Sequence, residues 1–572
     1  MVVCGKVPAI VPTEPGVFMS SRPTKWLPAA LVLLVVAASI ALFAHDSEPT
    51  VVDVLDLEGL DDPDYAVRFR AAMKLVRSKD EGLDVRLTQM LRQTPDSSPE
   101  RTAVEFIRWK RSGEPLPAGG QREGGKPNIL LISIDTLRAD HLGCYGYGRP
   151  TSPNIDALAK KGVLFENAFS PASWTLPGHM SIFTSLYPSF HKLEARRGRL
   201  RLDSSEKTIA ELLKGVGYRT ASFVTSPYLG AKWGFDQGFD LYFRHGAVVR
   251  AAKQTQTVIG WLDWHVFHER RGLEPSGFFL FVHYMDPHET YNAPQPFHDR
   301  HTGHYEGALR PDDHFVTMFL KEDFRSQADY QYVLALYDGE VSYVDDQIGR
   351  LLDRFDELGL LDSTVIALTS DHGEEFKDHG GMGHKTTVYA EQLRVPLIIA
   401  NPPRIPAGRR VSSQASLVDI YPTLVGLIGE EIPPQVQGID LGQFFTHAST
   451  HDEHGVKPKP TSEPPPQFAE LGPLGRTWEA PYYKRAIRTD RYKLILNYDQ
   501  DFKQLFDVRA DPREQHNLYP SMRNDAGIRE LERRLTAFVE AGAAYNPSAR
   551  GQNEIELDQK TREQLRALGY AE

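Results

Sequence analysis

Cysteine is almost absent from this chain. Its 572 residues include only two, Cys4 and Cys144, and no Cys-x-x-Cys motif. Two cysteines cannot make the disulfide framework that holds small secreted domains together. The sequence therefore gives no support to a disulfide-rich fold or to catalysis by a cysteine.

Long basic runs are absent as well. Lysine and arginine number 65 against 76 acidic residues, so the formal net charge is -11. This balance argues against a nucleic-acid partner. The length allows a large hydrophobic core with additional segments around it.

One uncharged apolar stretch, residues 26–44, is long enough to cross a bilayer as a helix. Basic residues precede it and acidic residues follow it, which predicts a cytoplasmic segment 1–25, a transmembrane anchor 26–45 and an extracytoplasmic remainder, periplasmic or extracellular. The two cysteines would then lie on opposite sides of the membrane. A cleaved signal peptide is the alternative, but the region before the apolar stretch is long and Leu42 is bulky for a cleavage site.

Composition divides the rest of the chain into segments. Apolar residues at helical spacing predict a helical stalk over 50–112, and a Gly- and Pro-rich linker follows at 113–125. A catalytic domain is predicted over 126–445 and a Pro-rich linker or flap over 446–480. Short strands and a helix predict an antiparallel α+β subdomain over 481–545, and the tail 546–572 carries a short helix at 561–568.

Buried strands alternate with helices after residue 127. Nearly continuous apolar runs at 128–134, 278–283, 364–369 and 395–399 read as strands, with helices at 152–161 and 330–360. This order predicts an α/β sandwich around a largely parallel sheet. The ligand site of such sheets lies at the carboxyl ends of the strands, where Asp135, His288, Asp371 and His372 fall.

Residues 173–179 (SWTLPGH) place a hydroxyl, that of Thr175, near the start of an apolar helix. The positive end of a helix favours an anion. A hydroxyl in this position is usually a helix cap, and threonine is a weak nucleophile without a metal or base. A catalytic role for Thr175 therefore depends on ligands from elsewhere in the chain.

The strand ends supply such ligands. Asp135, Thr175, Asp371 and His372 would give a divalent metal three oxygen ligands and one nitrogen ligand, which suits Zn²⁺, Mn²⁺ or Ca²⁺. A metal on the Thr175 hydroxyl would make an alkoxide available near neutral pH. Each residue alone has an ordinary structural explanation, but the group does not.

Further polar residues are candidates for contact with the substrate. Lys385 would supply a positive charge to an ester oxygen, and His384 precedes it. His288 would contact the same group or protonate a leaving group. With His179, which lies one helical turn after Thr175, they complete the candidate catalytic set.

The chain from 127 to about 520 resembles the sulfatase family of the alkaline phosphatase superfamily. The matching segments occur in the family's order: 127–140 (PNILLISIDTLRAD), 151–159 (TSPNIDALA), 286–288 (DPH), 370–374 (SDHGE), 383–389 (GHKTTVY), 394–398 (RVPLI) and 505–508 (LFDV), with Asp511-Pro512 and Asn517-Leu518. The resemblance implies an alkaline-phosphatase-like sandwich, one divalent metal on Asp135, Thr175, Asp371 and His372, and contact of the ester with Lys385 and His288.

Four positions depart from the family pattern. Sulfatases usually have a second Asp where Thr136 stands, and often Asn where His372 stands. Their nucleophile lies in Cys/Ser-x-Pro-x-Arg and is oxidised to formylglycine, whereas this chain has Thr175 with His179 in place of the arginine. Formylglycine needs a Cβ with two hydrogens, and threonine has a methyl group there. The aldehyde-hydrate route is therefore closed.

A threonine nucleophile is what relatives that process phosphoryl groups use. The sequence thus predicts a metal-dependent hydrolase of a phosphate or sulfate ester, with phosphoesters and phosphodiesters favoured. The alternatives are a sulfuric ester hydrolase, transfer of a phosphoryl group to a lipid or glycan, and a family member without activity. A second metal on Asp286, His288 and His384 is a further alternative, against which Lys385 counts because its charge would replace that metal.

Overall fold

The computed structural model describes residues 57, 59–80, 82–95, 98–115, 126–193, 201–246, 248–275, 277–311, 313–314, 326–400, 405–444, 465–472, 483–498, 502–545 and 558–567. From residue 58 onward these belong to one compact unit. The predicted segment 1–25 and anchor 26–45 lie outside the described residues, so the anchor and the extracytoplasmic location stay predictions. No helix among those described is long and apolar enough to span a bilayer.

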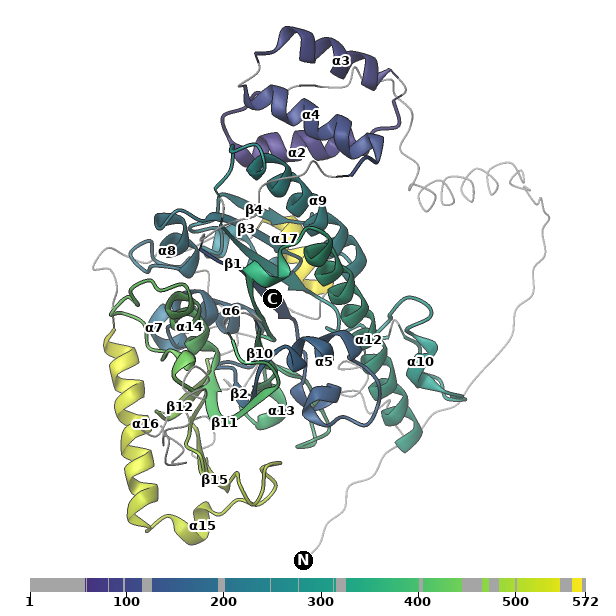
Figure 1. Ribbon diagram of the computed structural model, residues 1–572. Helices are drawn as coiled ribbons and strands as arrows, with labels where there is room; N and C mark the ends of the chain where they lie inside the picture. Colours follow the sequence, from purple (N-terminus) through teal and green to yellow (C-terminus); the bar gives the residue numbers. More distant parts are fainter. Residues whose placement is uncertain are drawn as a thin grey trace, which may run out of the picture. The chain divides into compact units, whose positions relative to one another are not determined.

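A nine-stranded sheet runs through the centre of this unit (Figure 1). Its order is β11-β2-β10-β6-β1-β5-β3-β4, and β9 pairs with β2. The strands are β1 (Asn128–Ile134), β2 (Gly162–Phe169), β3 (Arg219–Val224), β4 (Leu241–Arg244), β5 (Phe278–Tyr284), β6 (Thr364–Thr369), β9 (Arg394–Val395), β10 (Leu397–Ala400) and β11 (Arg409–Ser416).

The sheet is mixed: most of its strand pairings are parallel, as predicted, and those of β9 and β10 are antiparallel. β1 is parallel to both neighbours, β5 and β6, and β3 is parallel to β5 and β4. β10 is antiparallel to β6 and β2, and β9 is antiparallel to β2. A short apolar run shows that a strand is buried but not its direction, so the sequence could not reveal this reversal.

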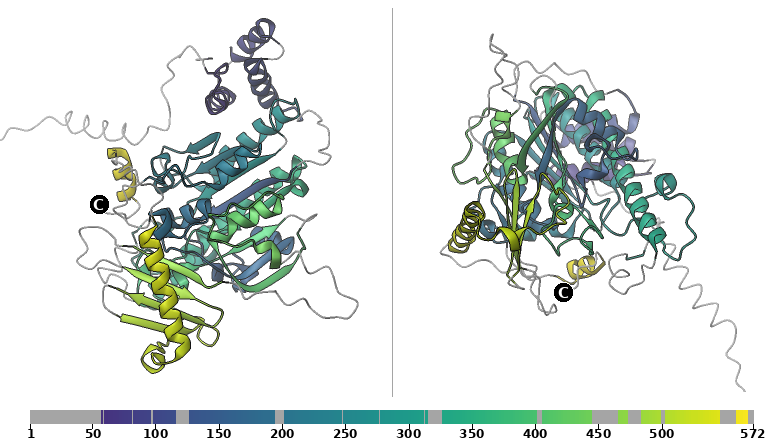
Figure 2. Two further views of the ribbon diagram at one scale, coloured as in Figure 1. Left: turned by 90° about the vertical axis from the view of Figure 1, so that its left-hand side faces the viewer. Right: turned by 90° about the horizontal axis from the view of Figure 1, so that it is seen from below.

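Helices cover both faces of the sheet (Figures 1 and 2). One layer contains α5 (Pro153–Lys160), α9 (Ala251–Glu269) and α12 (Gln327–Glu357). The other contains α6 (Thr175–Thr184), α8 (Ile209–Gly215) and α14 (Ile420–Leu427). All seven residues of β1 are buried between these layers, as its apolar run predicts.

Three helices precede the sheet: α2 (Tyr65–Val76), α3 (Leu83–Gln93) and α4 (Pro99–Ser112). They lie where the sequence predicts short amphipathic helices. α2 and α4 pack on α9, where the rings of Phe69 and Phe106 lie 6.0 and 5.0 Å from the Trp264 ring, centroid to centroid. An ion pair joins Lys110 of α4 to the buried Asp263 of α9.

The final elements form a separate antiparallel sheet, β12 (Gln467–Leu471), β13 (Lys484–Arg488), β14 (Tyr492–Asn497) and β15 (Phe502–Asp507), packed on α16 (Ala526–Ala544). The last three strands and the helix were predicted. β12 lies inside the segment predicted as a linker or flap, 446–480, most of which lies outside the described residues. Its five residues become a strand because they pair with β13, a long-range contact invisible in a short Pro-flanked segment. The tail helix α17 (Gln559–Ala567) lies where a short helix was predicted.

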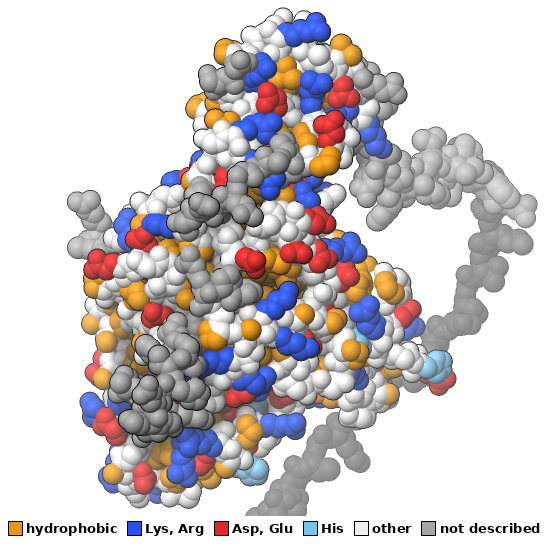
Figure 3. All heavy atoms as spheres, viewed as in Figure 1, with side chains coloured by type: hydrophobic (Ala, Val, Ile, Leu, Met, Phe, Trp, Pro, Cys, Tyr) orange, Lys and Arg blue, Asp and Glu red, His pale blue; other side chains and the backbone are white. Residues whose placement is uncertain are grey.

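Charged side chains are spread over the surface but gather inside the molecule. On the face shown in Figure 3, lysine and arginine are interspersed with aspartate and glutamate. Some ion pairs involve buried side chains: Asp263 also pairs with Arg354 at 2.5 Å, and Lys493 pairs with Glu514 at 2.9 Å. The carboxylates at the strand ends form another buried group, and it marks the candidate site.

The packing of α4 on α9 predicts a large stability effect at Phe106. This side chain is fully buried and contacts the rings of Trp109, Trp264 and Phe267. Replacing it in Phe106→Ala should lower the free energy of unfolding by about 3–5 kcal/mol, measured by urea denaturation. The exposed Val85→Ala, at 71% exposure, should change it by less than about 0.5 kcal/mol. Equal effects of the two variants would contradict the packing described here.

Candidate active site

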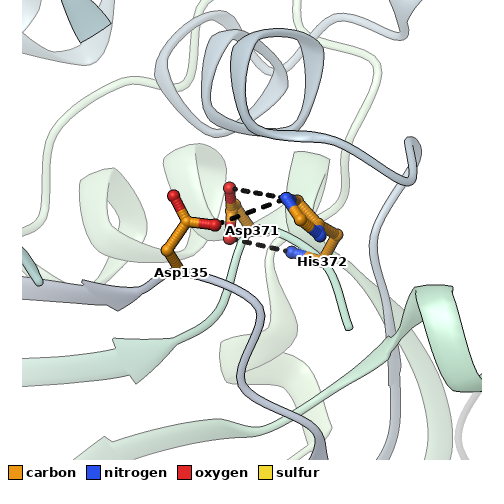
Figure 4. A group of neighbouring side chains, drawn as sticks. All are labelled: Asp135, Asp371 and His372. Carbon is orange, nitrogen blue, oxygen red and sulfur yellow. Dashed lines mark hydrogen bonds and ion pairs between the residues drawn. The ribbon is translucent and has the colours of Figure 1, made fainter. Parts of the chain in front are cut away.

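The adjacent strands β1 and β6 each end in acidic residues. The two strands are parallel, with Ser133 opposite Thr369, so Asp135 and Asp371 follow them at the same edge of the sheet. Asp135, Asp371 and His372 are fully buried, and each offers a ligand atom within 4.8 Å of the others. Figure 4 shows the three side chains directed toward one another. The predicted convergence at the strand ends is therefore present.

Thr175 joins this group from the first residue of α6. Its Oγ1 lies 3.5 Å from Asp135 Oδ2 and 3.5 Å from His372 Nε2. Trp174 occupies the cap position, and no side-chain hydrogen bond caps this helix. The hydroxyl of Thr175 is thus directed at the acidic cluster, and the alternative that it caps the helix is wrong.

Gly178 allows the start of α6 to come this close. A Cβ built on Gly178 would lie 2.7 Å from the backbone oxygen of Asp371, a distance that side chains do not tolerate. Any larger residue would push the helix away from the loop that carries Asp371. The glycine in the Thr-Leu-Pro-Gly-His sequence is therefore required for the distance between Thr175 and its neighbours.

The turn after β1 has an unusual backbone held by hydrogen bonds. Thr136 has φ +57°, a left-handed conformation that is costly for a β-branched residue. The Tyr337 hydroxyl donates to the Thr136 carbonyl at 2.9 Å and accepts from the Arg138 N–H at 3.0 Å. The Thr136 N–H in turn donates to Asp371 Oδ1 at 3.4 Å. α12, which carries Tyr337, thus fixes the turn that orients Asp135.

The donor set fits a cation. His372 Nδ1 lies 2.9 Å from the Gly373 carbonyl, which only accepts, so Nδ1 carries the hydrogen and Nε2 presents a lone pair. That lone pair faces Asp135 Oδ1 at 3.5 Å and Asp371 Oδ2 at 3.4 Å. Within the described part of the chain, neither of these two buried oxygens has a hydrogen-bond partner. Three lone-pair donors directed at one point are stabilised by a metal ion between them.

The electrostatics support the same interpretation. Burial raises the pKa of Asp135 well above its usual range, and the charges of Asp371 and Glu374 raise it further. Burial lowers the pKa of His372, which favours the unprotonated ring that binds metals. A divalent cation would offset the repulsion between the two carboxylates. Oxygen and imidazole ligands of this kind suit Zn²⁺, Mn²⁺ or Ca²⁺.

His179 lies behind Thr175. Its Nδ1 donates to the Thr175 carbonyl at 2.9 Å and lies 3.3 Å from Asp371 Oδ2. Its Nε2 accepts from the Ser133 hydroxyl at 2.9 Å. The ring is fully buried, so these contacts make His179 a residue that holds Thr175 and Asp371 in place.

His283 is a site residue that the sequence analysis missed. It belongs to β5, where its Nδ1 bonds to Thr225 at 2.9 Å and its Nε2 lies 3.4 Å from Asp135 Oδ2. The ring is fully buried, and burial lowers its pKa well below the usual value. A histidine inside an otherwise apolar strand was the available signal, but a strand prediction treats such a residue as part of the core.

The remaining candidates lie on the other side of His372. The His384 ring is 4.5 Å from the His372 ring and 5.1 Å from the His288 ring, centroid to centroid. The carboxylate of Glu374, to which the sequence analysis gave no role, accepts from His384 Nδ1 at 2.9 Å. His288 Nδ1 donates to the Glu289 carbonyl at 2.8 Å, and burial lowers the pKa of His288 to about 3.

Lys385 lies on a loop held from two sides. Its backbone has φ +64°, and its N–H donates to the Ser173 carbonyl at 2.9 Å, two residues before Thr175. The next residue, Thr386, accepts from Lys484 Nζ of β13 at 2.8 Å. The C-terminal sheet therefore helps to position the loop that carries Lys385.

The structure does not assemble the second metal site. The three proposed ligands were Asp286, His288 and His384. Among the described residues, the group formed by Asp135, Asp371 and His372 is the only one with three ligands within reach of a single ion. Asp286 instead interacts with Glu340 and Arg250, and these three residues line a pocket together with His288.

Most of segment 244–277, which precedes β5, is helical. Residues 251–269 form α9, whose side chains are largely buried against the sheet and against α2 and α4. Of the described residues in this segment, 248–250 line a pocket that His288 also lines.

Comparison with known proteins identifies the family. The sequence model of the family described as Sulfatase matches residues 127–430, which is more than half of the chain. This chain belongs to the sulfatase family. A second model, described as N-sulphoglucosamine sulphohydrolase, C-terminal, matches residues 478–541. The protein is therefore a sulfatase-family hydrolase, an enzyme that acts on ester bonds.

Individual relatives differ in their named substrates. An ulvan-active sulfatase of Formosa agariphila is 27% identical over 447 residues, 73% of this chain and 81% of that protein. The multifunctional alkaline phosphatase superfamily protein PehA of Trinickia caryophylli is 24% identical over 522 residues. The match covers 74% of this chain and 98% of that protein. The crystal structure of the phosphonate monoester hydrolase of Agrobacterium radiobacter matches with a TM-score of 0.57 at 21% identity. The match covers 76% of this chain and 100% of that chain. That structure shares the alkaline-phosphatase-like fold of this chain.

Metal binding should stabilise the fold. At a Mn²⁺ or Zn²⁺ concentration 100 times the dissociation constant, the free energy of unfolding should rise by about 2.7 kcal/mol. Because Asp135 must lose its proton to bind, and its pKa is raised, the gain should be smaller at about pH 5 than at about pH 8. Thermal unfolding of metal-stripped and reloaded protein measures both effects.

The gain should disappear in Asp371→Asn and persist in Asp299→Asn, whose carboxylate is exposed and distant in the sequence from the site. An equal gain in both variants would place the metal elsewhere.

The contact between Lys484 and the Thr386 carbonyl should affect turnover. In Lys484→Met the loop loses this hydrogen bond, so kcat should fall about tenfold through misplacement of Lys385. Steady-state kinetics on an aryl ester substrate tests this, with Lys503→Met, on the next but one strand, as the control. A change in KM alone would show that Lys484 serves binding and not the alignment of Lys385.

Proposed function

We propose that this protein is a metal-dependent hydrolase of phosphate esters, with phosphodiesters favoured, and that Thr175 is its nucleophile. The observation that carries the proposal is the position of Thr175 Oγ1, 3.5 Å from both Asp135 Oδ2 and His372 Nε2 and unused as a helix cap. Threonine cannot form formylglycine, so a direct attack by the hydroxyl replaces the aldehyde-hydrate chemistry.

In the first step Thr175 Oγ attacks phosphorus. An Oγ–P bond forms, and the bond from phosphorus to the departing oxygen breaks with its electron pair. The hydroxyl proton passes to water, and the departing alkoxide or aryl oxide takes a proton from water. A divalent cation held by Asp135, Asp371 and His372 would lower the pKa of the Thr175 hydroxyl and withdraw charge from the ester oxygens.

The chain itself supplies positive charge for the transferring group. Lys385 contributes an ammonium next to the site, where its charge acts on Asp135, His288 and His372. The positive end of α6 lies at Thr175 and favours the developing negative charge on the ester oxygens. His179 holds the backbone of Thr175 and thereby the direction of its hydroxyl.

In the second step water attacks the phosphothreonine. The new bond forms from water oxygen to phosphorus, the Oγ–P bond breaks, and Thr175 recovers its hydroxyl. The low pKa of His288 favours the neutral ring. A neutral ring does not fit the protonation of a leaving group, and contact with the ester is the other of the two roles that the sequence analysis gave to His288.

Hydrolysis of sulfate esters is the second candidate. The relatives support it, because the Formosa agariphila protein is named a sulfatase and the Agrobacterium radiobacter enzyme a phosphonate monoester hydrolase. The same residues would attack sulfur in the same way. The nature of residue 175 favours the phosphate ester, and the names of most relatives favour the sulfate ester.

Variants at Thr175 test the nucleophile. Thr175→Ala should lower kcat/KM for bis-p-nitrophenyl phosphate at least about 1,000-fold, because no other hydroxyl would replace Oγ1. Thr175→Ser keeps the hydroxyl and should retain much of the activity. The assay compares bis-p-nitrophenyl phosphate, p-nitrophenyl phosphate and p-nitrophenyl sulfate with the Mn²⁺- or Zn²⁺-loaded full-length protein.

Faster turnover of the sulfate than of either phosphate would overturn the preference for phosphate esters. Full activity of Thr175→Ala would overturn the nucleophile.

A further inference from the structure

A pocket of about 380 Å³ lies beside His288, at the edge of the candidate active site. We call it the side pocket. His288, whose ring contacts His384 in the active site, forms part of its wall. Its lining also includes Arg250 at the start of α9, Asp286 and Glu289 after β5, and Glu340 in the middle of α12. A group attached to an ester bound at Thr175 would pass His288 to enter this pocket.

Two acidic side chains are buried in the wall of the side pocket. Asp286 is 8% exposed and Glu340 is 2% exposed. Burial raises the pKa of both, and the Asp286 carboxylate raises that of Glu340 further. In the described structure, Asp286 Oδ2 and Glu340 Oε2 are buried without a hydrogen-bond partner. Unpartnered buried carboxylate oxygens are costly unless a donor reaches them.

One cation lies beside this pair. Arg250 Nη1 is 3.7 Å from Glu340 Oε1, beyond a direct hydrogen bond, and its side chain is 48% exposed. A single, half-exposed guanidinium offsets about one of the two buried charges. The pair therefore needs a further proton or a further cation to reach neutrality.

Three kinds of ligand group could lie against Asp286 and Glu340: a metal ion, a hydroxyl and an ammonium. A metal ion needs more ligands than two carboxylates, and no third metal ligand joins Asp286 and Glu340 in the described residues. A hydroxyl would satisfy one oxygen but leave the charge in place. An ammonium supplies three donors and a full positive charge, so it satisfies both Asp286 Oδ2 and Glu340 Oε2.

We propose that the side pocket binds a primary ammonium group on the organic part of the ester substrate, through Asp286 and Glu340. The proposal rests on the proposed function in one respect, namely that the ester group itself lies at Thr175. It adds a specificity determinant from α12 and from the loop after β5. Substrates of this enzyme are accordingly aminoalkyl esters.

A binding experiment tests the pocket without requiring turnover. Isothermal titration calorimetry with the metal-loaded full-length protein compares 2-aminoethylphosphonate and 3-aminopropylphosphonate with the ethyl and propyl analogues, none of which has an ester bond. At least one amine should bind about tenfold more tightly than its alkyl analogue. Glu340→Gln and Asp286→Asn should abolish that difference, and the exposed Glu306→Gln should keep it. Equal affinity of amine and alkyl compounds for the unaltered protein would overturn the proposal, even if the variants fail to fold.

A kinetic experiment separates this proposal from the proposed function. It compares the 2-aminoethyl, 2-hydroxyethyl and ethyl esters of 4-nitrophenyl phosphate. The expected order of kcat/KM places the aminoethyl ester first by about tenfold, with the preference lost in Glu340→Gln. A hydroxyethyl ester that equals or exceeds the aminoethyl ester would overturn the ammonium site. Tighter binding of the amines without hydrolysis of any ester would support the ammonium site and contradict the proposed function.

Discussion

The structure depends on two buried carboxylates, those of Asp135 and Asp371, that lie close together and repel each other. Two buried carboxylates, an imidazole lone pair and a hydroxyl converge where β1, β6 and α6 meet. Without a cation, burial and the charge of Asp371 raise the pKa of Asp135 far above its usual range. Such a group is unfavourable in itself and is stable only because the surrounding elements hold it and a metal ion can neutralise it.

The neighbouring elements can be understood as the supports of this group. Gly178 lets α6 approach the Asp371 backbone, and Tyr337 holds the strained turn at Thr136. His179 ties Thr175 to Asp371. The C-terminal sheet reaches the same region through Lys484 and the loop of Lys385. Residues from β1, α6, α12, the loops that carry Asp371 and Lys385, and the C-terminal sheet therefore contribute to one site, which explains why its motifs are spread over so much of the chain.

The sequence predicted the parts of the fold that local pattern determines. Buried runs such as β1 and β6 lie where predicted because an apolar stretch ending in an aspartate is both a strand and a ligand position. Partners far along the chain determine the direction of β10, the strand β12 and the packing of α9. A local sequence pattern does not predict such contacts. His283 was missed for the same reason, since its role follows from the register of β5 beside β1. Glu340 lies in the middle of a long helix, where only the fold shows that it reaches Asp286.

The proposed mechanism centres on a covalent bond between Thr175 and the transferred group. The most direct measurement is to quench the metal-loaded enzyme with acid during turnover of bis-p-nitrophenyl phosphate, digest it and map the modified peptide by mass spectrometry. We expect a p-nitrophenyl phosphoryl group on Thr175, and no modified peptide from Thr175→Ala. Steady turnover with an unmodified Thr175 peptide at every quench time, together with turnover by Thr175→Ala, would contradict it and assign the attack to water.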